Sequence, residues 1–155
     1  MKTKIIDFIK RNRVSTTEVA DCLAKSGNLP SIKAVNRGKF VVGSVFWTYI
    51  WGDSNWNVHK EIEMAQEGDV ILVHSFENSQ RAIFGELVSK YLLLYRQAGG
   101  IVVEGLLRDA QALIKENWPI WCKDFSPIGC FNECNDHEIC NEIIQKYKEL
   151  YHGSI

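Results

Sequence analysis

The second half of the chain alternates short apolar runs with stretches of helical spacing. The apolar runs are residues 70–74, 100–103 and 119–122, and the helical stretches are residues 81–97 and 109–117. Strands that alternate with helices are typical of a parallel sheet, because each helix carries the chain back to the start of the next strand. The alternation therefore predicts an α/β domain with parallel pairing in its second half.

Further elements are predicted on both sides of this alternation. Ser15 to Glu18 form a capping box, which opens a helix that we expect to stop at Gly27. Phe40–Ile50, Val70–His74 and Gly100–Val103 are expected to be the central strands, covered by helices that begin near Asn57, Arg81 and Asp109. The other predicted elements are a helix at residues 3–12, a loop at residues 28–39, a turn at residues 52–55 and a final helix from Asn135, with Ile139, Ile143, Tyr147, Leu150 and Tyr151 on its apolar side.

Composition limits the classes of function. The chain has 155 residues, which fits a single domain over residues 1–155, and its formal net charge of −1 disfavours direct binding of nucleic acid. No run approaches the roughly 18 apolar residues of a membrane span, so no membrane partner is expected. Five cysteines without a signal-peptide core at the N-terminus predict free thiols and a cytoplasmic protein.

Two charged segments are candidate binding sites. If a helix begins near Gly85 and Glu86, the N–H groups of Leu87 and Val88 can bind a carboxylate or a phosphate; alternatively, Gly85 permits close packing and Glu86 interacts with the helix dipole. Arg108-Asp109 follows a predicted strand. Asp109 can cap the next helix or bind Mg²⁺ or Mn²⁺, and Arg108 can hold an anionic oxygen through its planar guanidinium.

Three other groups favour structural interpretations. Cys130, Cys134, His137 and Cys140, with Cys122 nearby, could bind zinc, but their spacing lacks a paired C-x-x-C, so reduced thiols are favoured. His59 is expected to make an interior hydrogen bond. The tryptophans Trp47, Trp51 and Trp56 are expected in the core or in subunit contacts, because no basic stripe accompanies them as in a base-stacking surface.

Eight short segments form an ordered set along the chain. As a signature of a protein family, the set is more specific than any single segment. The segments are Ser15–Leu23, Gly52–Asn55, His59–Ala65, Gly68–Val73, Arg81–Glu86, Gly100–Asp109, Trp118–Trp121 and Ser126–Gly129. Together they resemble the RraA-like family, which contains regulators of ribonuclease activity and metal-dependent 4-hydroxy-4-methyl-2-oxoglutarate aldolases. The resemblance covers residues 14–130 and leaves residues 131–155 as a divergent helical tail.

The resemblance implies a swivelling β/β/α fold, a trimeric assembly and a set of roles. Asp109 would bind Mg²⁺ or Mn²⁺, Arg108 would hold the oxo group of a small 2-oxo acid, and Glu86 would orient metal-bound water. Gly85, Leu87 and Val88 complete the implied substrate-binding set, the last two through backbone N–H groups on the pyruvate carboxylate.

The sequence departs from the family pattern at three points. Twenty-one residues separate Glu86 from Arg108, one more than usual; residues 74–78 replace an Asp and a glycine run; and a polar helix replaces later glycine-rich strands. The favoured function is a metal-dependent lyase that cleaves 4-hydroxy-2-oxo acids to pyruvate or decarboxylates oxaloacetate. The alternatives are a non-catalytic regulator that binds a ribonuclease and an inactive, shortened relative.

Overall fold

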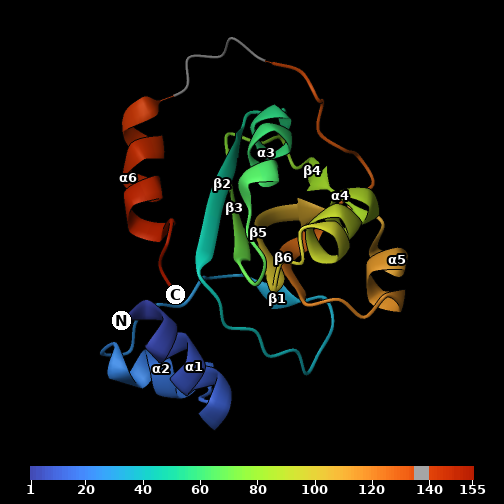
Figure 1. Ribbon diagram of the computed structural model, residues 1–155. Coiled ribbons are helices and arrows are strands. Elements are labelled where there is room, and N and C mark those ends of the chain that lie inside the picture. Colours follow the sequence, from blue (N-terminus) through green and yellow to red (C-terminus); the bar gives the residue numbers. More distant parts are fainter. Residues whose placement is uncertain (135–139) are drawn as a thin grey trace.

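A mostly parallel six-stranded sheet forms the centre of the protein. The computed structural model describes residues 1–134 and 140–155. The sheet has the strand order β1-β6-β5-β3-β2, with β4 paired to β5, and among the strand pairs of the described residues only β1–β6 is antiparallel (Figure 1). The strands are β1 (Lys33–Ala34), β2 (Val45–Trp51), β3 (Val70–Phe76), β4 (Ala82–Phe84), β5 (Gly100–Leu107) and β6 (Ile120–Phe125).

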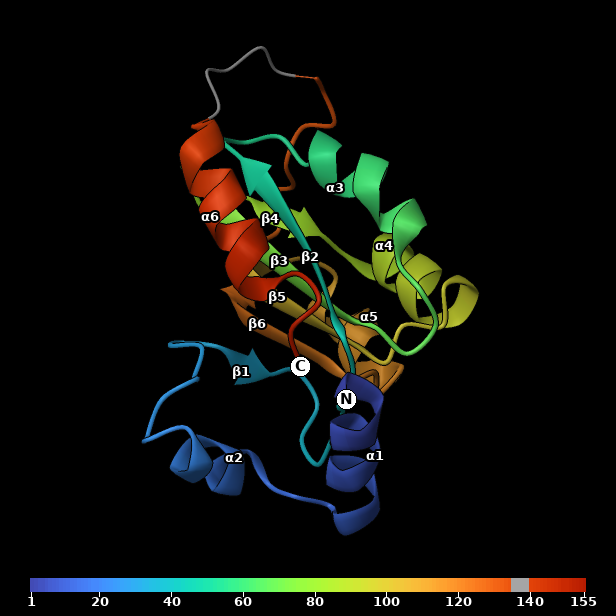
Figure 2. The same ribbon diagram turned by 60° about the vertical axis from the view of Figure 1, so that its left-hand side comes forward.

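Helices cover both faces of this sheet. One face carries α3 (Trp56–Glu61) with the 3₁₀ turn η1 (Ile62–Met64), α4 (Glu86–Lys90) with the π-helical turn η2 (Tyr91–Tyr95), and α5 (Ala110–Lys115), whereas α6 (Asn141–Tyr151) lies on the opposite face (Figures 1 and 2). The α/β class and the parallel pairing predicted from the alternation are therefore confirmed.

Two predicted elements exist but begin elsewhere, and one of them has another place in the sheet. Residues 82–84 form strand β4 and not the start of a helix from Arg81, because Ala82 and Phe84 pair with Leu106 and Leu107 of β5 and are buried there. The strand predicted over Phe40–Ile50 begins at Val45 and lies at the edge of the sheet, whereas β3 and β5 are central.

Aliphatic side chains fill the space between the sheet and α3, α4 and α5. Alternate residues of β3 and β5 point to this side, including Ile71, Val73, Ile101 and Val103, and all four are fully buried. Leu92 of η2 and Leu113 of α5 pack against them. Such burial contributes about 25 cal/mol per Å² of apolar surface, so this layer holds the three helices against the sheet.

The opposite face of the sheet is aromatic and includes a buried histidine. His74 is 2% exposed, accepts the indole N–H of Trp47 at Nδ1 (2.8 Å), and contacts Glu104 Oε2 through Nε2 (2.8 Å). Tyr147 and Tyr151 of α6 contact the His74 ring. Burial lowers the pKa of His74 below its ordinary value, against the opposing influence of Glu104. This arrangement fits a neutral imidazole with its proton on Nε2.

The tail is predicted in part. The final helix exists but begins at Asn141, and Tyr147 and Tyr151 face the sheet. Ile143 and Leu150 are exposed, and the predicted contribution of Ile139 lies outside the described residues. Gly153 and Ser154 hydrogen-bond to Val45, and these bonds cover the start of the edge strand β2.

Two N-terminal helices precede the sheet. They are α1 (Lys2–Asn12) and α2 (Thr16–Cys22), and neither contains a buried residue. The capping box at Ser15 and Glu18 is confirmed, but α2 ends at Cys22 and not at Gly27. Among the helices described in residues 1–134 and 140–155, none is long and apolar enough to cross a membrane.

Candidate active site

The candidate site lies where two neighbouring parallel strands end. Strand β4 leads through Gly85 into α4, and β5 leads through Arg108 and Asp109 into α5. Because β4 and β5 pair in parallel, both exits lie at the same edge of the sheet, and the N–H of Arg108 donates to the carbonyl of Phe84 (3.0 Å). Gly85, Glu86, Arg108 and Asp109 are thereby brought together, as is common for binding sites of α/β proteins.

Asp109 connects the two exits. Its backbone has φ 59° and ψ 36°, a left-handed conformation that is uncommon for a residue with a side chain. It occupies the N-cap position of α5, but its side chain makes no hydrogen bond to that helix. The prediction that the Asp109 side chain caps α5 is therefore wrong. Its Oδ2 instead accepts the N–H of Glu86 (3.0 Å), which places a carboxylate at the N-terminal end of α4.

The side chains of Glu86 and Arg108 are both accessible. The Glu86 carboxylate accepts a hydrogen bond from Lys90 Nζ (2.6 Å), and this contact raises the pKa of Lys90. Arg108 Nε lies 3.8 Å from Asp109 Oδ2, and half of the Arg108 side chain is exposed. The guanidinium is thus free to bind an anionic oxygen from solvent.

The N-terminal turn of α4 adjoins a hollow of about 330 Å³. Its lining residues are His59, Ile62, Glu63, Leu87, Val88 and Tyr91. The N–H of Ser89 donates to the carbonyl of Gly85, so the preceding N–H groups of Leu87 and Val88 have no acceptor within their own helix. Arg108 and Asp109 do not line this hollow. His59, for which the sequence predicts an interior hydrogen bond, lines this hollow. Burial lowers the pKa of His59.

The side chains at this site could hold a divalent ion only if water molecules supplied most of its ligands. Within residues 1–134 and 140–155, no three His, Cys, Asp or Glu side chains are grouped to hold a metal. Asp109 supplies one hard oxygen ligand, and Mg²⁺ commonly keeps several waters beside one or two carboxylates. The zinc alternative includes His137, which lies outside the described residues. Burial raises the pKa of Cys122 and of Cys130 to about 11, which fits protonated thiols.

Comparisons with known proteins identify the family of this chain. A family model for RraA-like proteins, described as Aldolase/RraA, matches residues 16–144. The chain belongs to the RraA-like family. A protein of Halalkalibacterium halodurans, provisionally named a 4-hydroxy-4-methyl-2-oxoglutarate aldolase, is 36% identical over 122 residues, which cover 76% of this chain and 57% of that protein. The chain therefore spans little more than half the length of this relative.

Solved structures of the family share the fold. Streptomyces coelicolor RraAS2, described as an unusual member of the RNase ES inhibitor RraA family, has a TM-score of 0.69 at 24% identity and matches 79% of this chain and 64% of its own. The RNA-processing inhibitor RraA from Thermus thermophilis has a TM-score of 0.67 at 21% identity. The match covers 79% of this chain and 74% of that protein. At these identities the likeness establishes the fold.

Proposed function

We propose that the protein is a divalent-metal-dependent lyase. The reactions are cleavage of a 4-hydroxy-2-oxo acid to pyruvate and decarboxylation of oxaloacetate. The proposal is supported above all by the contact between Asp109 and the N–H of Glu86, since it brings a metal-type ligand to a helix start, beside the half-exposed guanidinium of Arg108. The family membership and the aldolase-type name of a relative also support it.

Each residue has a chemical task in this proposal. Both reactions form a pyruvate enolate, and a cation placed against that developing charge is typically the largest catalytic contribution. Arg108 would bind the 2-oxo oxygen, while the N–H groups of Leu87 and Val88, with Gly85 giving access, would bind the carboxylate. Asp109 would hold a Mg²⁺ or Mn²⁺ ion, which supplies a second positive charge when bound. Glu86 would orient a water molecule beside that ion.

The test is release of pyruvate from a panel of 4-hydroxy-2-oxo acids and from oxaloacetate. Each substrate is assayed with EDTA, Mg²⁺ or Mn²⁺, and metal-only blanks correct for spontaneous decarboxylation. We expect metal-dependent release that Asp109→Asn abolishes and Arg108→Lys lowers strongly, because an ammonium cannot reproduce the guanidinium's two-pronged contact. Asp21→Asn, a carboxylate change on α2, is the matched control. Wild-type protein without turnover under any metal would contradict the proposal.

A non-catalytic regulator is the second candidate, and one surface favours it. On α4 and η2, Leu87, Leu94 and Tyr95 are 82%, 62% and 73% exposed, a large apolar surface for a helix of this size. Such a surface suits a ribonuclease partner or the homotrimer implied by the family resemblance. Light scattering tests the trimer, and a monomer mass at micromolar concentration would contradict it. If pyruvate release fails, inhibition of a purified ribonuclease by the wild type and by a Leu87→Asp variant tests the regulator.

A further inference from the structure

The Arg108 side chain lies between two glycines. A Cβ atom added at Gly85 would lie 2.7 Å from Arg108 Cγ, and one added at Gly129 would lie 2.7 Å from Arg108 Nη1. Both separations are shorter than any ordinary carbon contact, so the Arg108 side chain occupies the space that a side chain at either glycine would fill. The Arg108 guanidinium therefore lies over the backbone of Gly129, so a displacement of Gly129 changes the space open to the guanidinium.

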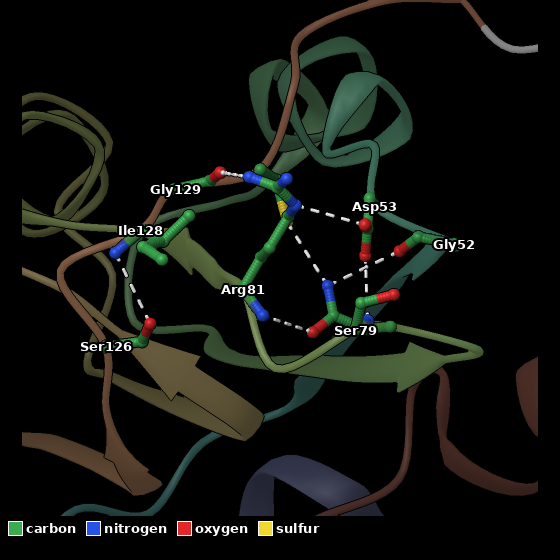
Figure 3. A network of polar contacts seen from close by, with 9 residues as sticks. Gly52, Asp53, Ser79, Arg81, Ser126, Ile128 and Gly129 are labelled. Carbon is green, nitrogen blue, oxygen red and sulfur yellow. Dashed lines mark hydrogen bonds and ion pairs between the residues drawn. The ribbon is translucent and has the colours of Figure 1, made fainter.

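Gly129 is held by Arg81, which lies 48 residues earlier in the chain. Arg81 Nη1 donates to the carbonyl of Gly129 (3.1 Å), as Figure 3 shows. The neighbouring residue Ala82 donates to the carbonyl of Ile128 (2.7 Å) and accepts the N–H of Cys130 (2.9 Å). Three hydrogen bonds thus fix the three residues around Gly129 to the start of β4.

Arg81 is in turn fixed by Asp53. Arg81 Nε donates to Asp53 Oδ2 (3.0 Å), and Asp53 Oδ1 accepts the N–H of Ser79 (2.7 Å) (Figure 3). The guanidinium also lies over the ring of Phe131, 4.5 Å from its centroid. The Ser79 N–H, with a smaller contribution from Arg81, holds the pKa of Asp53 below its ordinary value, so the carboxylate stays ionised at neutral pH. Both side chains of the pair are 27% exposed.

We propose that Asp53 and Arg81 are positioning residues that set the place of the Arg108 guanidinium through the backbone of Gly129. The proposal rests on the proposed function only in assigning Arg108 to the 2-oxo group. Arg81 uses two nitrogens at once, one for Asp53 and one for Gly129, which a single lysine ammonium cannot do. Arg81→Lys therefore keeps the positive charge but loses the simultaneous bonds to Asp53 and to the Gly129 carbonyl.

The test measures Arg108 itself and the binding of an enolate analogue. The heteronuclear NOE of the Arg108 Nε–Hε signal, assigned by its loss in Arg108→Lys, reports the order of the side chain. Titration of oxalate with Mg²⁺, followed by calorimetry, reports binding. The variants are Arg81→Lys, Asp53→Asn and Gly129→Ala. The matched control is Arg96→Lys, since Arg96 also donates to a backbone carbonyl, that of Ala65, away from this site.

We expect all three site variants to lower the NOE of Arg108 and to weaken oxalate binding roughly tenfold, because small displacements of a binding group are costly. In active enzyme, KM should rise more than kcat falls, and Arg96→Lys should change neither quantity. Unchanged NOE and oxalate affinity within twofold in Arg81→Lys and Asp53→Asn would overturn the proposal, and so would a lower melting temperature with an unchanged NOE.

The two proposals can fail separately. If the wild type neither turns over substrate nor binds oxalate, the lyase function fails, and the NOE of Arg108 alone decides whether Asp53 and Arg81 position it. If Arg81→Lys does not fold, Asp53→Asn and Gly129→Ala supply the same test, because Asn keeps an acceptor for Ser79 and the Gly129 change leaves the pair intact.

Discussion

Gly85→Ala is expected to destabilise the protein by displacing Asp109. A Cβ atom at Gly85 would lie 2.1 Å from Asp109 Oδ2. The φ of Gly85 is −145°, outside the left-handed region, so alanine meets no backbone penalty there through φ. At a position without steric conflict, Gly→Ala usually stabilises by about 0.4–1 kcal/mol through the unfolded chain. A loss of stability at Gly85 therefore reports its steric conflict with Asp109 and with Arg108 Cγ, which would lie 2.7 Å from the same Cβ.

The magnitude follows from this distance. An ordinary C···O contact is about 3.3–3.6 Å, so the carboxylate must move by more than about 1 Å. That movement breaks its hydrogen bond with the N–H of Glu86, which is 3.0 Å long. A hydrogen bond to a charged group contributes about 1.5–3 kcal/mol, and 45% exposure of the Asp109 side chain favours the lower end. When a further cost of overpacking is added, we expect Gly85→Ala to lower the free energy of unfolding by about 2–3 kcal/mol. For a chain of this length, that corresponds to roughly 5–10 °C in melting temperature.

A double-mutant cycle isolates the interaction. Urea unfolding followed by circular dichroism is measured for wild type, Gly85→Ala, Asp109→Ala and the double variant. Once the Asp109 carboxylate is absent, Gly85→Ala should cost less by at least about 1 kcal/mol, since residues in contact couple by 0.5–3 kcal/mol. Equal costs in both backgrounds, or a Gly85→Ala protein as stable as wild type, would refute the reasoning.

Three other groups, Asp109, His74 and the cysteines, lead to measurable predictions. Asp109→Asn should lower the melting temperature by no more than about 4 °C, because the amide oxygen can accept the same N–H at a cost of about 1 kcal/mol; a larger loss in calorimetry would contradict this. The pKa of His74 is lowered in the fold, so the unfolded chain takes up the proton first and stability should fall as pH drops below about 6.5. His74→Gln, whose amide can still accept the indole N–H of Trp47, should lose less stability between pH 7 and 5.5 in urea titrations than the wild type does. An equal loss in both proteins would show that protonation of His74 does not cause the fall in stability. Because the pKa of Cys130 is raised to about 11 and Cys22 is exposed, iodoacetamide at pH 8 should modify Cys22 well before Cys130 by mass spectrometry, and the reverse order would contradict the burial.

Much of the fold could be predicted from local sequence because short-range physics determines it. The apolar runs at residues 70–74 and 100–103 are too hydrophobic to face water. The chain between them is long enough for the crossover that a parallel pair needs, and the two strands pair in parallel. The capping box at Ser15 closes within four residues, so no tertiary contact is needed to form it. The eight ordered segments likewise indicate the family through their residues alone, because their order and spacing are features of the chain itself.

The tertiary structure decided which distant residues meet. Ala82–Phe84 lies in a longer stretch of helical spacing, and it is a strand because the last residues of β5 pair with it. Asp109 stands where a helix cap is expected, yet its carboxylate binds the helix start beyond β4. The contact of Gly129 with Arg108, and its bond to Arg81, join three segments that lie far apart in sequence. Local periodicity carries no information on such pairings, because they depend on strand order and register, which the whole chain sets when its core packs.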